Sequence, residues 1–230
     1  MMQTELERNI SEVDRRIRAA EKASGRATGV VSLLAVSKTK ASELVRQAHG
    51  FGLSAFGENY AQEMVEKAAA LADLPLSWHF IGPIQSNKTA LIAEVSDWVH
   101  SIDRLKVARR LSEQRPGDKA PLNVLVQINT SNEDSKSGVG PDAAPELMAA
   151  INELSGLRLR GLMTIPAATT NQTEQREPFR QLRELMNQLS DSLPQLDTLS
   201  MGMSGDLEAA VSEGANIVRV GTDIFGARYN

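Results

Sequence analysis

A lysine that follows the first strongly apolar segment of the chain could act as a nucleophile. Residues 31–36 are mostly apolar, and Ser37, Lys38 and Thr39 come next, before a helix expected to begin near residue 41. At the carboxyl end of a buried strand, the amine of Lys38 can point into the cavity that the strand ends surround, where partial burial makes it nucleophilic toward aldehydes. The alternative is an ordinary loop lysine with its ammonium group in water, because lysine is seldom buried.

Two glycine-containing segments near the carboxyl terminus could bind an anion. They read LSMGMSGD at residues 199–206 and VRVGTDIFG at residues 218–226, each at the end of a predicted strand, with Ser204 expected to cap the helix that follows the first. Glycine lets the backbone approach an anion closely, and the amino end of a helix directs free N–H groups toward it. The candidate phosphate ligands are Ser200, Ser204, Gly221 and Thr222. The alternative is that the glycines only allow the turns between strands and helices.

An arginine, Arg219, lies within the last predicted strand, between Val218 and Val220. Because side chains alternate along a strand, the arginine points away from these valines, into either the barrel interior or the helix layer. A buried guanidinium needs a partner, since burying an unpaired charge is costly. The partner is either an acidic residue in a structural ion pair or a ring nitrogen or acid group of a ligand.

Together, the lysine, the anion-binding segments and the arginine suit pyridoxal 5′-phosphate. The cofactor carries an aldehyde for the lysine, a phosphate for the glycine-containing segments and a pyridine nitrogen for the arginine.

Other reactive residues are scarce. The sequence contains no cysteine, which excludes disulfides and thiolate metal sites and is typical of a reducing compartment. The histidines lack metal-ligand spacing: His49 is expected to be solvated, and His79 and His100 are expected to be hydrogen-bonded core residues. We therefore predict no metal site, and carboxylates such as Glu58 are too generic to nominate for acid–base chemistry.

The elements that must position these residues alternate regularly between strands and helices. Eight strand–helix units in about 200 residues indicate a parallel sheet closed into a (β/α)8 TIM barrel of the α/β class. The strands are expected at residues 31–36, 53–57, 77–81, 98–102, 122–129, 157–164, 198–201 and 217–220. With an extra amphipathic helix at about residues 4–23, we expect residues 1–230 to form a single domain. A doubly wound open sheet is the alternative, but no GxGxxG motif follows the first strand.

Charge and hydropathy exclude several classes of protein. The net charge is −4 and the charges are interspersed, so the sequence has no electrostatic footprint for nucleic acid. It contains no run of about 18 apolar residues, and its amino-terminal segment is too polar for a signal peptide. We therefore expect a cytoplasmic protein with neither nucleic acid nor membrane as a partner.

The same residues resemble a known family, the pyridoxal phosphate homeostasis proteins. The match runs from about residue 30 to about residue 228, and residues 78–88, WHFIGPIQSNK, are its most distinctive segment. The other matching segments are LLAVSKTK, AFGENYAQE, QINTSNEDSKSGV, GLMTIP and LSMGMSGDLEAAVSEGANIVRVGTDIFGAR. The sequence departs from the family at Gly205, where an acidic residue is expected.

The resemblance implies a barrel like the N-terminal domain of alanine racemase and of bacterial-type ornithine decarboxylase. It implies that Lys38 forms a Schiff base with the cofactor and that Arg219 faces the pyridine nitrogen. It also implies that Ser200, Gly221 and Thr222 bind the phosphate, and that Asn59 lies near the cofactor. Members of the family bind pyridoxal phosphate and influence vitamin B6 and amino-acid pools, without an established catalytic activity.

The chemistry expected from these residues agrees with a non-catalytic role. An arginine does not give up a proton, so it leaves the pyridine nitrogen unprotonated and weakens the ring as an electron sink. Racemases of this fold have a second domain, whereas this chain stops at Asn230, and its only tyrosines are Tyr60 and Tyr229. We therefore expect no catalytic residues in a monomer that holds pyridoxal phosphate, binds other B6 vitamers and contacts apo-enzymes transiently to deliver the cofactor. The alternative is a pyridoxal-phosphate-dependent amino-acid racemase or lyase.

Overall fold

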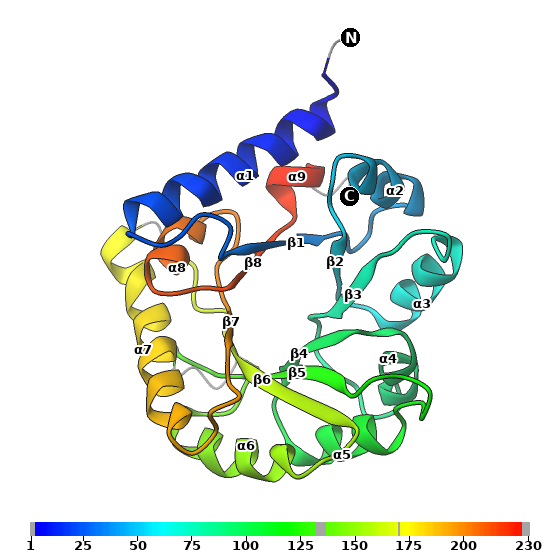
Figure 1. Ribbon diagram of the computed structural model, residues 1–230, viewed down its shortest axis with the longest axis vertical. Helices are drawn as coiled ribbons and strands as arrows, with labels where there is room; N and C mark the ends of the chain where they lie inside the picture. Colours follow the sequence, from blue (N-terminus) through cyan, green and yellow to red (C-terminus); the bar gives the residue numbers. More distant parts are fainter. Residues whose placement is uncertain (1–2, 132–136, 170, 227–230) are drawn as a thin grey trace.

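Eight parallel strands form a closed barrel that helices surround (Figure 1). The computed structural model describes residues 3–131, 137–169 and 171–226. Each strand pairs with the next one along the chain, and β8 pairs with β1, so the prediction of a (β/α)8 barrel is confirmed and the open-sheet alternative is wrong. The strands are β1 (Ser32–Val36), β2 (Ala55–Glu58), β3 (Ser77–Phe80), β4 (Trp98–Ile102), β5 (Leu122–Gln127), β6 (Leu157–Met163), β7 (Thr198–Ser200) and β8 (Ile217–Val220).

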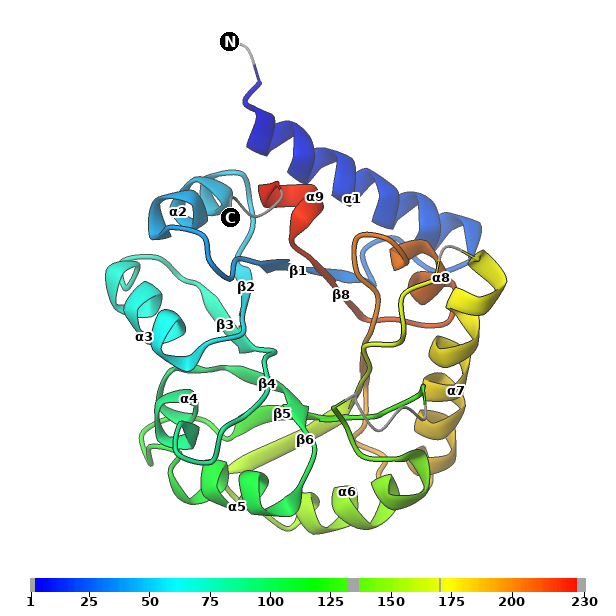
Figure 2. The ribbon, with the colours of Figure 1, turned by 180° about the vertical axis from the view of Figure 1, so that it is seen from behind.

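Helices cover the outside of the barrel, as Figures 1 and 2 show from opposite sides. They are α1 (Glu5–Ala23), α2 (Ser42–Gly50), α3 (Ala61–Ala70), α4 (Thr89–Val95), α5 (Leu105–Glu113), the 3-10 helix η1 (Pro141–Ala143), α6 (Ala144–Asn152), α7 (Gln172–Ser190), α8 (Leu207–Ser212) and α9 (Thr222–Phe225). In the part of the chain that the structure describes, no helix combines the length and apolarity needed to cross a bilayer.

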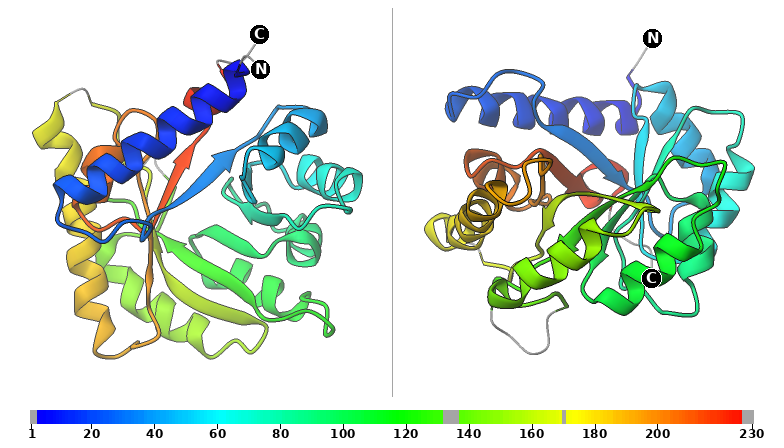
Figure 3. Two further views of the ribbon diagram at one scale, coloured as in Figure 1. Left: turned by 45° about the horizontal axis from the view of Figure 1, so that its top comes forward. Right: turned by 60° about the horizontal axis from the view of Figure 1, so that its bottom comes forward.

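The extra amino-terminal helix is confirmed as α1, which lies across the outside of the barrel beside α8 and α9 (Figures 1 and 3). It begins where the Thr4 hydroxyl accepts a hydrogen bond from the Glu7 amide at 3.1 Å, a typical N-cap. Its apolar side chains recur at spacings of three and four residues and are buried against the barrel; they are Ile10, Val13, Ile17 and Ala20. The helix therefore covers the seam at which β8 meets β1.

The carboxylate of Glu21, near the end of α1, sets the path of the chain into β1. It is fully buried and accepts hydrogen bonds from the backbone amides of Gly29 at 2.9 Å and Val31 at 2.8 Å. Arg18 donates to the same carboxylate at 2.8 Å, which neutralises the buried charge. The first strand, and with it the lysine that follows, is thus anchored to α1 before it enters the barrel.

The strands are buried on both faces, as parallel strands in such a barrel must be. In β5 the consecutive residues Val124, Leu125 and Val126 are all fully buried. Val124 and Val126 belong to the hydrophobic layer between strands and helices, so Leu125, which alternates with them, points into the barrel. Continuous apolar runs in the sequence therefore identify these strands better than alternation does.

The ends of β2 and β3 approach each other closely at Gly82, within the distinctive segment of residues 78–88. A Cβ atom at Gly82 would lie 2.2 Å from the Asn59 carbonyl oxygen and 2.6 Å from its Cα atom. The Ser101 hydroxyl donates to the Gly82 carbonyl at 2.5 Å and holds this backbone in place from β4. Only glycine fits here without displacing the backbone of Asn59, a residue that is expected to lie near the cofactor.

Replacing Gly82 by alanine should therefore lower the free energy of unfolding by about 1–3 kcal/mol, the usual cost of forcing an extra methyl group into a packed site. Urea unfolding of the variant and the wild type measures this difference. Gly117→Ala is the matched control, because a Cβ atom there meets nothing within 4 Å. Equal midpoints for the two variants would contradict the packing argument.

Candidate functional site

The lysine predicted to be reactive lies at the carboxyl end of the barrel, beside the turn that follows β8. Lys38 is half-buried and lies two residues beyond the end of β1. Ala35 pairs with Val220, so the turn at Gly221 comes at the same end of the barrel. A Cβ atom at Gly221 would lie 3.1 Å from the Val36 carbonyl oxygen, so these two strand ends are in direct contact. The structure thus brings Lys38 and Gly221 together, as the sequence predicts.

The residues on either side of Lys38 are tied to the barrel wall. We call residues 37–39 the lysine turn. The Ser37 hydroxyl donates to the Glu58 carboxylate at 2.6 Å, and the Thr39 amide donates to the Glu63 carboxylate at 2.5 Å. The neighbouring Lys40 ammonium donates to the carbonyls of Phe225 and Gly226, so it serves to hold the end of α9.

Arg219 points into the barrel interior, and its guanidinium has two fixed partners. One Nη donates to the Ser200 hydroxyl at 2.8 Å, and the other donates to the Thr164 carbonyl at 2.8 Å. The side chain is 3% exposed, and burial lowers its pKa to about 10 although the Asp206 carboxylate acts in the opposite direction. Among the described residues no carboxylate forms an ion pair with Arg219. The two contacts occupy two of the five N–H donors that a guanidinium has.

A chain of hydrogen bonds continues from Arg219 through the interior of the barrel. Ser200 Oγ lies 2.8 Å from His100 Nδ1, His100 Nε2 lies 2.9 Å from His79 Nδ1, and His79 Nε2 lies 3.2 Å from Ser77 Oγ. Arginine can only donate, so the Ser200 hydroxyl accepts from Arg219. In the three bonds that follow, the donor and the acceptor depend on the tautomers of His100 and His79.

Both histidines in this chain are buried and neutral. Burial lowers the pKa of His79 to about 3. Burial also lowers the pKa of His100 well below its usual value, and the charge of Arg219 acts in the same direction. The sequence-based prediction that they are hydrogen-bonded core residues is confirmed. Ser200, predicted as a phosphate ligand, is fully buried, and its hydroxyl already contacts Arg219 and His100.

The two glycine-containing segments lie together because an arginine from α1 links them. Arg16 donates to the Ser204 carbonyl at 2.9 Å in the first segment and to the Asp223 carboxylate at 2.7 Å in the second. It also pairs with Glu208, in the first turn of α8. Thr222 is exposed at the start of α9, next to Gly221. The sequence analysis missed Arg16, because nothing local distinguishes it from the other arginines of α1.

The prediction that Ser204 caps the helix after β7 is wrong. The chain makes a turn at residues 204–206, α8 begins at Leu207, and Asp206 is the N-cap residue. The Asp206 carboxylate accepts a hydrogen bond from the Met203 amide at 2.5 Å, which closes this turn. The N-cap therefore lies two residues later than predicted. Ser204 itself is half-buried and remains next to the second segment through Arg16.

Asn59 lies directly after β2, and its side-chain oxygen is a buried hydrogen-bond acceptor. Its Oδ1 is buried and has no hydrogen-bond partner in the part of the chain that the structure describes. Buried acceptors are rarely left in this state, so the atom indicates a ligand or water position. Asn59 also lines a cavity of about 270 Å³ together with Phe80, Pro83 and Lys88, which come from or flank the distinctive segment. Tyr60 is 57% exposed, and Tyr229 lies outside the described residues.

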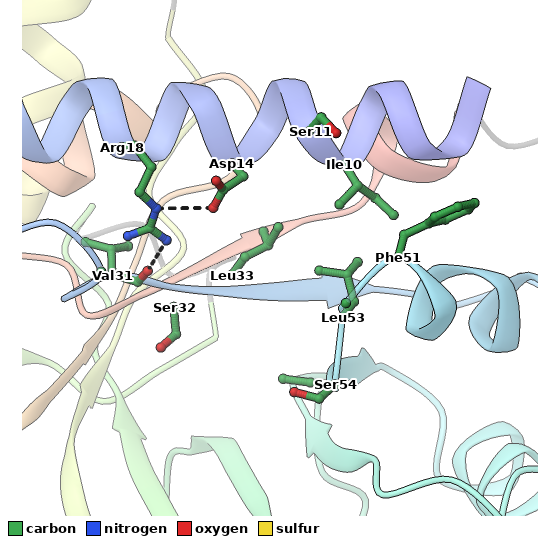
Figure 4. A pocket seen from close by; sticks show the side chains of 13 residues that line it. Ile10, Ser11, Asp14, Arg18, Val31, Ser32, Leu33, Phe51, Leu53 and Ser54 are labelled. Carbon is green, nitrogen blue, oxygen red and sulfur yellow. Dashed lines mark hydrogen bonds and ion pairs between the residues drawn. The ribbon is translucent and has the colours of Figure 1, made fainter. Parts of the chain in front are cut away.

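A second cavity, of about 620 Å³, lies at the opposite end of the barrel (Figure 4). It is bounded by α1 and by the amino ends of β1 and β2. Arg18 crosses its wall, where it contacts Asp14 at 3.1 Å and the Val31 carbonyl at 3.0 Å. None of the predicted site residues lines this cavity, so it is separate from the lysine site.

Comparisons with known proteins agree on one family. A family model described as the N-terminal domain of alanine racemase matches residues 6–229. The chain is 59% identical over 220 residues to the pyridoxal phosphate homeostasis protein of Pseudomonas aeruginosa, covering 96% of this chain and 94% of that protein. It is 50% identical over 223 residues to the protein of the same name from Escherichia coli K12, covering 96% and 95%.

Solved structures show the same similarity. PipY from Synechococcus elongatus, solved with pyridoxal phosphate bound, superposes with a TM-score of 0.81 at 34% identity, covering 93% of this chain and 100% of that one. An alanine racemase from Clostridium difficile superposes with a TM-score of 0.76 at 14% identity, covering 98% of this chain and 57% of that one. At that identity the racemase shares the fold, and nothing more follows from it.

The two neutral histidines should make stability fall at mildly acidic pH. Below a pH of about 6.5 the unfolded chain protonates both histidines, whereas the folded chain does not, so the free energy of unfolding decreases as the pH falls. Each histidine contributes at most about 1.4 kcal/mol per pH unit. Urea unfolding at about pH 6 and about pH 5 should show a smaller loss for His79→Gln than for the wild type, by on the order of 1 kcal/mol. Identical losses would mean that His79 does not stay neutral in the folded state.

Proposed function

The chain belongs to the family of the pyridoxal phosphate homeostasis proteins, and from this premise we propose that it holds pyridoxal 5′-phosphate through Lys38. The observation that carries the proposal is the position of this lysine. It is half-buried two residues beyond Val36, the end of β1, which lies against the turn at Gly221, and the residues on both sides of it are fixed by the barrel wall. Active sites of such barrels lie at this end.

The residues around Lys38 fit the cofactor. The buried Oδ1 of Asn59 needs a partner, and Gly221 brings backbone against Val36 where a Cβ atom would be a tight fit, 3.1 Å from the Val36 carbonyl oxygen. Arg219 carries N–H donors beyond the two used in its described contacts, which suits a pyridine nitrogen. When bound, the cofactor supplies an aldehyde and an aromatic ring that can accept electrons.

Each residue has a proposed role. The Lys38 amine condenses with the aldehyde, so that a C=N bond replaces the C=O bond and water leaves. Arg219 donates to the pyridine nitrogen, while Ser200 acts through Arg219 instead of binding the phosphate directly. Backbone amides at Gly221 and Thr222, together with the turn that begins at Ser204, hold the phosphate, and Arg16 keeps the two segments together.

We further propose that the protein holds and delivers the cofactor and does not turn over a substrate. The buried Arg219 supports this role, because an arginine leaves the pyridine nitrogen unprotonated and makes the ring a poor stabiliser of carbanions. The relatives in Pseudomonas and Escherichia are named for homeostasis of the cofactor and not for a reaction. In this proposal a monomer in the cytoplasm contacts apo-enzymes transiently and also accepts other B6 vitamers. An amino-acid racemase or lyase is the competing function.

Replacing Lys38 by alanine should abolish the covalent link to the cofactor. The wild type mixed with pyridoxal phosphate should develop the visible absorbance band of an imine, and borohydride should leave a reduced adduct on the peptide that contains Lys38. The variant should show neither, although weak noncovalent binding through the phosphate should persist. Pyridoxal, which lacks the phosphate, should bind the wild type at least about tenfold more weakly, since each charge-assisted hydrogen bond contributes about 1.5–3 kcal/mol. The same band and adduct in Lys38→Ala would refute the assignment.

Loaded protein should transfer its cofactor to an apo-enzyme without releasing it into solution. Mixing the two in the presence of a trap for free aldehydes tests this, because direct transfer activates the enzyme faster than the cofactor reaches the trap. Activation no faster than release into the trap would leave only a buffering role. A panel of common amino acids is the companion assay, and sustained racemisation or elimination that Lys38→Ala abolishes would establish the competing function.

A further inference from the structure

We infer that Lys67 is a positioning residue that fixes the lysine turn and thereby the amine of Lys38. This inference rests on the proposed function, because it assigns a role relative to the covalent bond between Lys38 and pyridoxal phosphate. Lys67 lies on α3, outside β1 and β2. Its ammonium group contacts the Ser37 carbonyl directly and contacts Glu63, which in turn holds Thr39.

Lys67 is buried, and its three N–H donors all have protein acceptors. The ammonium donates to the Ser37 carbonyl, to the Glu58 carboxylate and to the Glu63 carboxylate, each at 2.7 Å. Its side chain is 5% exposed, and that of Glu58 is fully buried. An ammonium group has three donors, so none remains for a ligand. Lys67 therefore acts on the site only through the residues it holds.

The acceptors of Lys67 are the groups that hold the lysine turn. Glu58 accepts from the Ser37 hydroxyl at 2.6 Å, and Glu63 accepts from the Thr39 amide at 2.5 Å. The residue before Lys38 thus has two contacts with the cluster of Glu58, Glu63 and Lys67, and the residue after it has one. We call these three side chains the wall cluster. The wall cluster thus holds the residues on both sides of Lys38, and its one cation is Lys67.

The backbone at Thr39 shows why the turn needs such a framework. Thr39 has a φ of +65°, and among the described residues other than glycine no other positive φ occurs. A β-branched residue is strained in this region, and strained backbone persists only where surrounding contacts over-determine it. The hydrogen bond from the Thr39 amide to Glu63 is such a contact. Without it, relaxation of Thr39 would move the adjacent Lys38.

The cation is also the main group that stabilises the charged form of the buried Glu58 carboxylate. Burial raises the pKa of Glu58, whereas the hydrogen bond and charge of Lys67, and the Ser37 hydroxyl, act in the opposite direction. Glu58 Oε2 is buried with no described partner, so this carboxylate depends on contacts at its other oxygen. Loss of Lys67 would leave the buried Glu58 carboxylate without its cation and would remove the hydrogen bond to the Ser37 carbonyl.

The inference separates covalent from noncovalent binding of the cofactor. Formation of the bond requires the amine to approach the aldehyde in a defined geometry, and a misplacement of about 1 Å can slow such a reaction on the order of a hundredfold. The cofactor's phosphate and ring contact other residues, including Gly221 and Arg219. A defect confined to the lysine turn should therefore affect an aldehyde and spare an analogue that has none.

The experiment compares pyridoxal phosphate with 4-deoxypyridoxine 5′-phosphate, which lacks the aldehyde. The variants are Lys67→Met, Ser37→Ala and Glu63→Gln; the last two retain the buried pair of Lys67 and Glu58, so they serve if Lys67→Met does not fold. Glu66→Gln is the matched control, because Glu66 is exposed on the same helix and contacts Gln62. The rate of imine formation is followed by absorbance, and affinity for the analogue by titration calorimetry.

We expect imine formation to slow at least about tenfold in the Lys67→Met, Ser37→Ala and Glu63→Gln variants. Their affinity for the analogue should stay within about twofold of that of the wild type. The Glu66→Gln control should match the wild type for both ligands. Unchanged imine formation in the variants overturns the inference, as does an equal loss of both ligands, which would indicate a general structural defect. If the wild type itself forms no imine, the proposed function fails and the inference fails with it; an imine that forms in the variants at the rate of the wild type refutes the inference alone.

Discussion

A guanidinium buried inside the barrel is the constraint on which the interior of this protein depends. Arg219 is 3% exposed and has no described ion-pair partner, so hydrogen bonds must compensate for the loss of water around its charge. A carbonyl from the end of β6 and a hydroxyl from β7 supply two of them. The hydroxyl also contacts His100, and His100 in turn contacts His79. The buried charge thus lies at one end of a hydrogen-bond chain that links four polar side chains from β3, β4 and β7.

The position of Lys38 depends on a different set of contacts, those of the wall cluster. Lys38 extends from a turn, and turns are more mobile than strands, so the contacts of the residues on either side of it help to fix its position. The wall cluster provides these contacts through a single ammonium group with three acceptors. An arrangement of this kind is costly to assemble in the interior, but it specifies one geometry once it has formed. The interior chain and the wall cluster together place an amine and a guanidinium at one end of the barrel.

The amino-terminal helix contributes to the same end of the molecule. Besides covering the seam between β8 and β1, α1 supplies Arg16 to the segments after β7 and β8, and Asn9 to the carbonyl of Ile224. The first-turn carboxylates Glu208 and Asp223 would repel a bound phosphate, and Arg16 neutralises both. The helix that lies outside the repeating pattern of the barrel is therefore part of the framework of its site.

The sequence alone determined the features that depend on local pattern. Apolar runs located the strands, their alternation with helices indicated the barrel, and the position of Lys38 after a buried run placed it at a strand end. The valines flanking Arg219 restricted its direction to one side of β8, and the strand context of His79 and His100 indicated a core position. Each of these follows from residues that are neighbours in the chain, where side-chain periodicity is set by the backbone itself.

Only the tertiary structure decided which groups meet. Ser200 contacts Arg219 from the next strand and His100 from β4, a hundred positions away in the chain. Arg16 and Asp223 are separated by 207 positions, and Ser37 and Lys67 by 30. The spacing of four between Glu63 and Lys67 on α3 is enough to predict their ion pair. It does not predict that the pair forms hydrogen bonds with the lysine turn. Hydrogen bonds and ion pairs depend on positions in space to within a few tenths of an ångström, and closure of the barrel, not the order of residues, sets those positions.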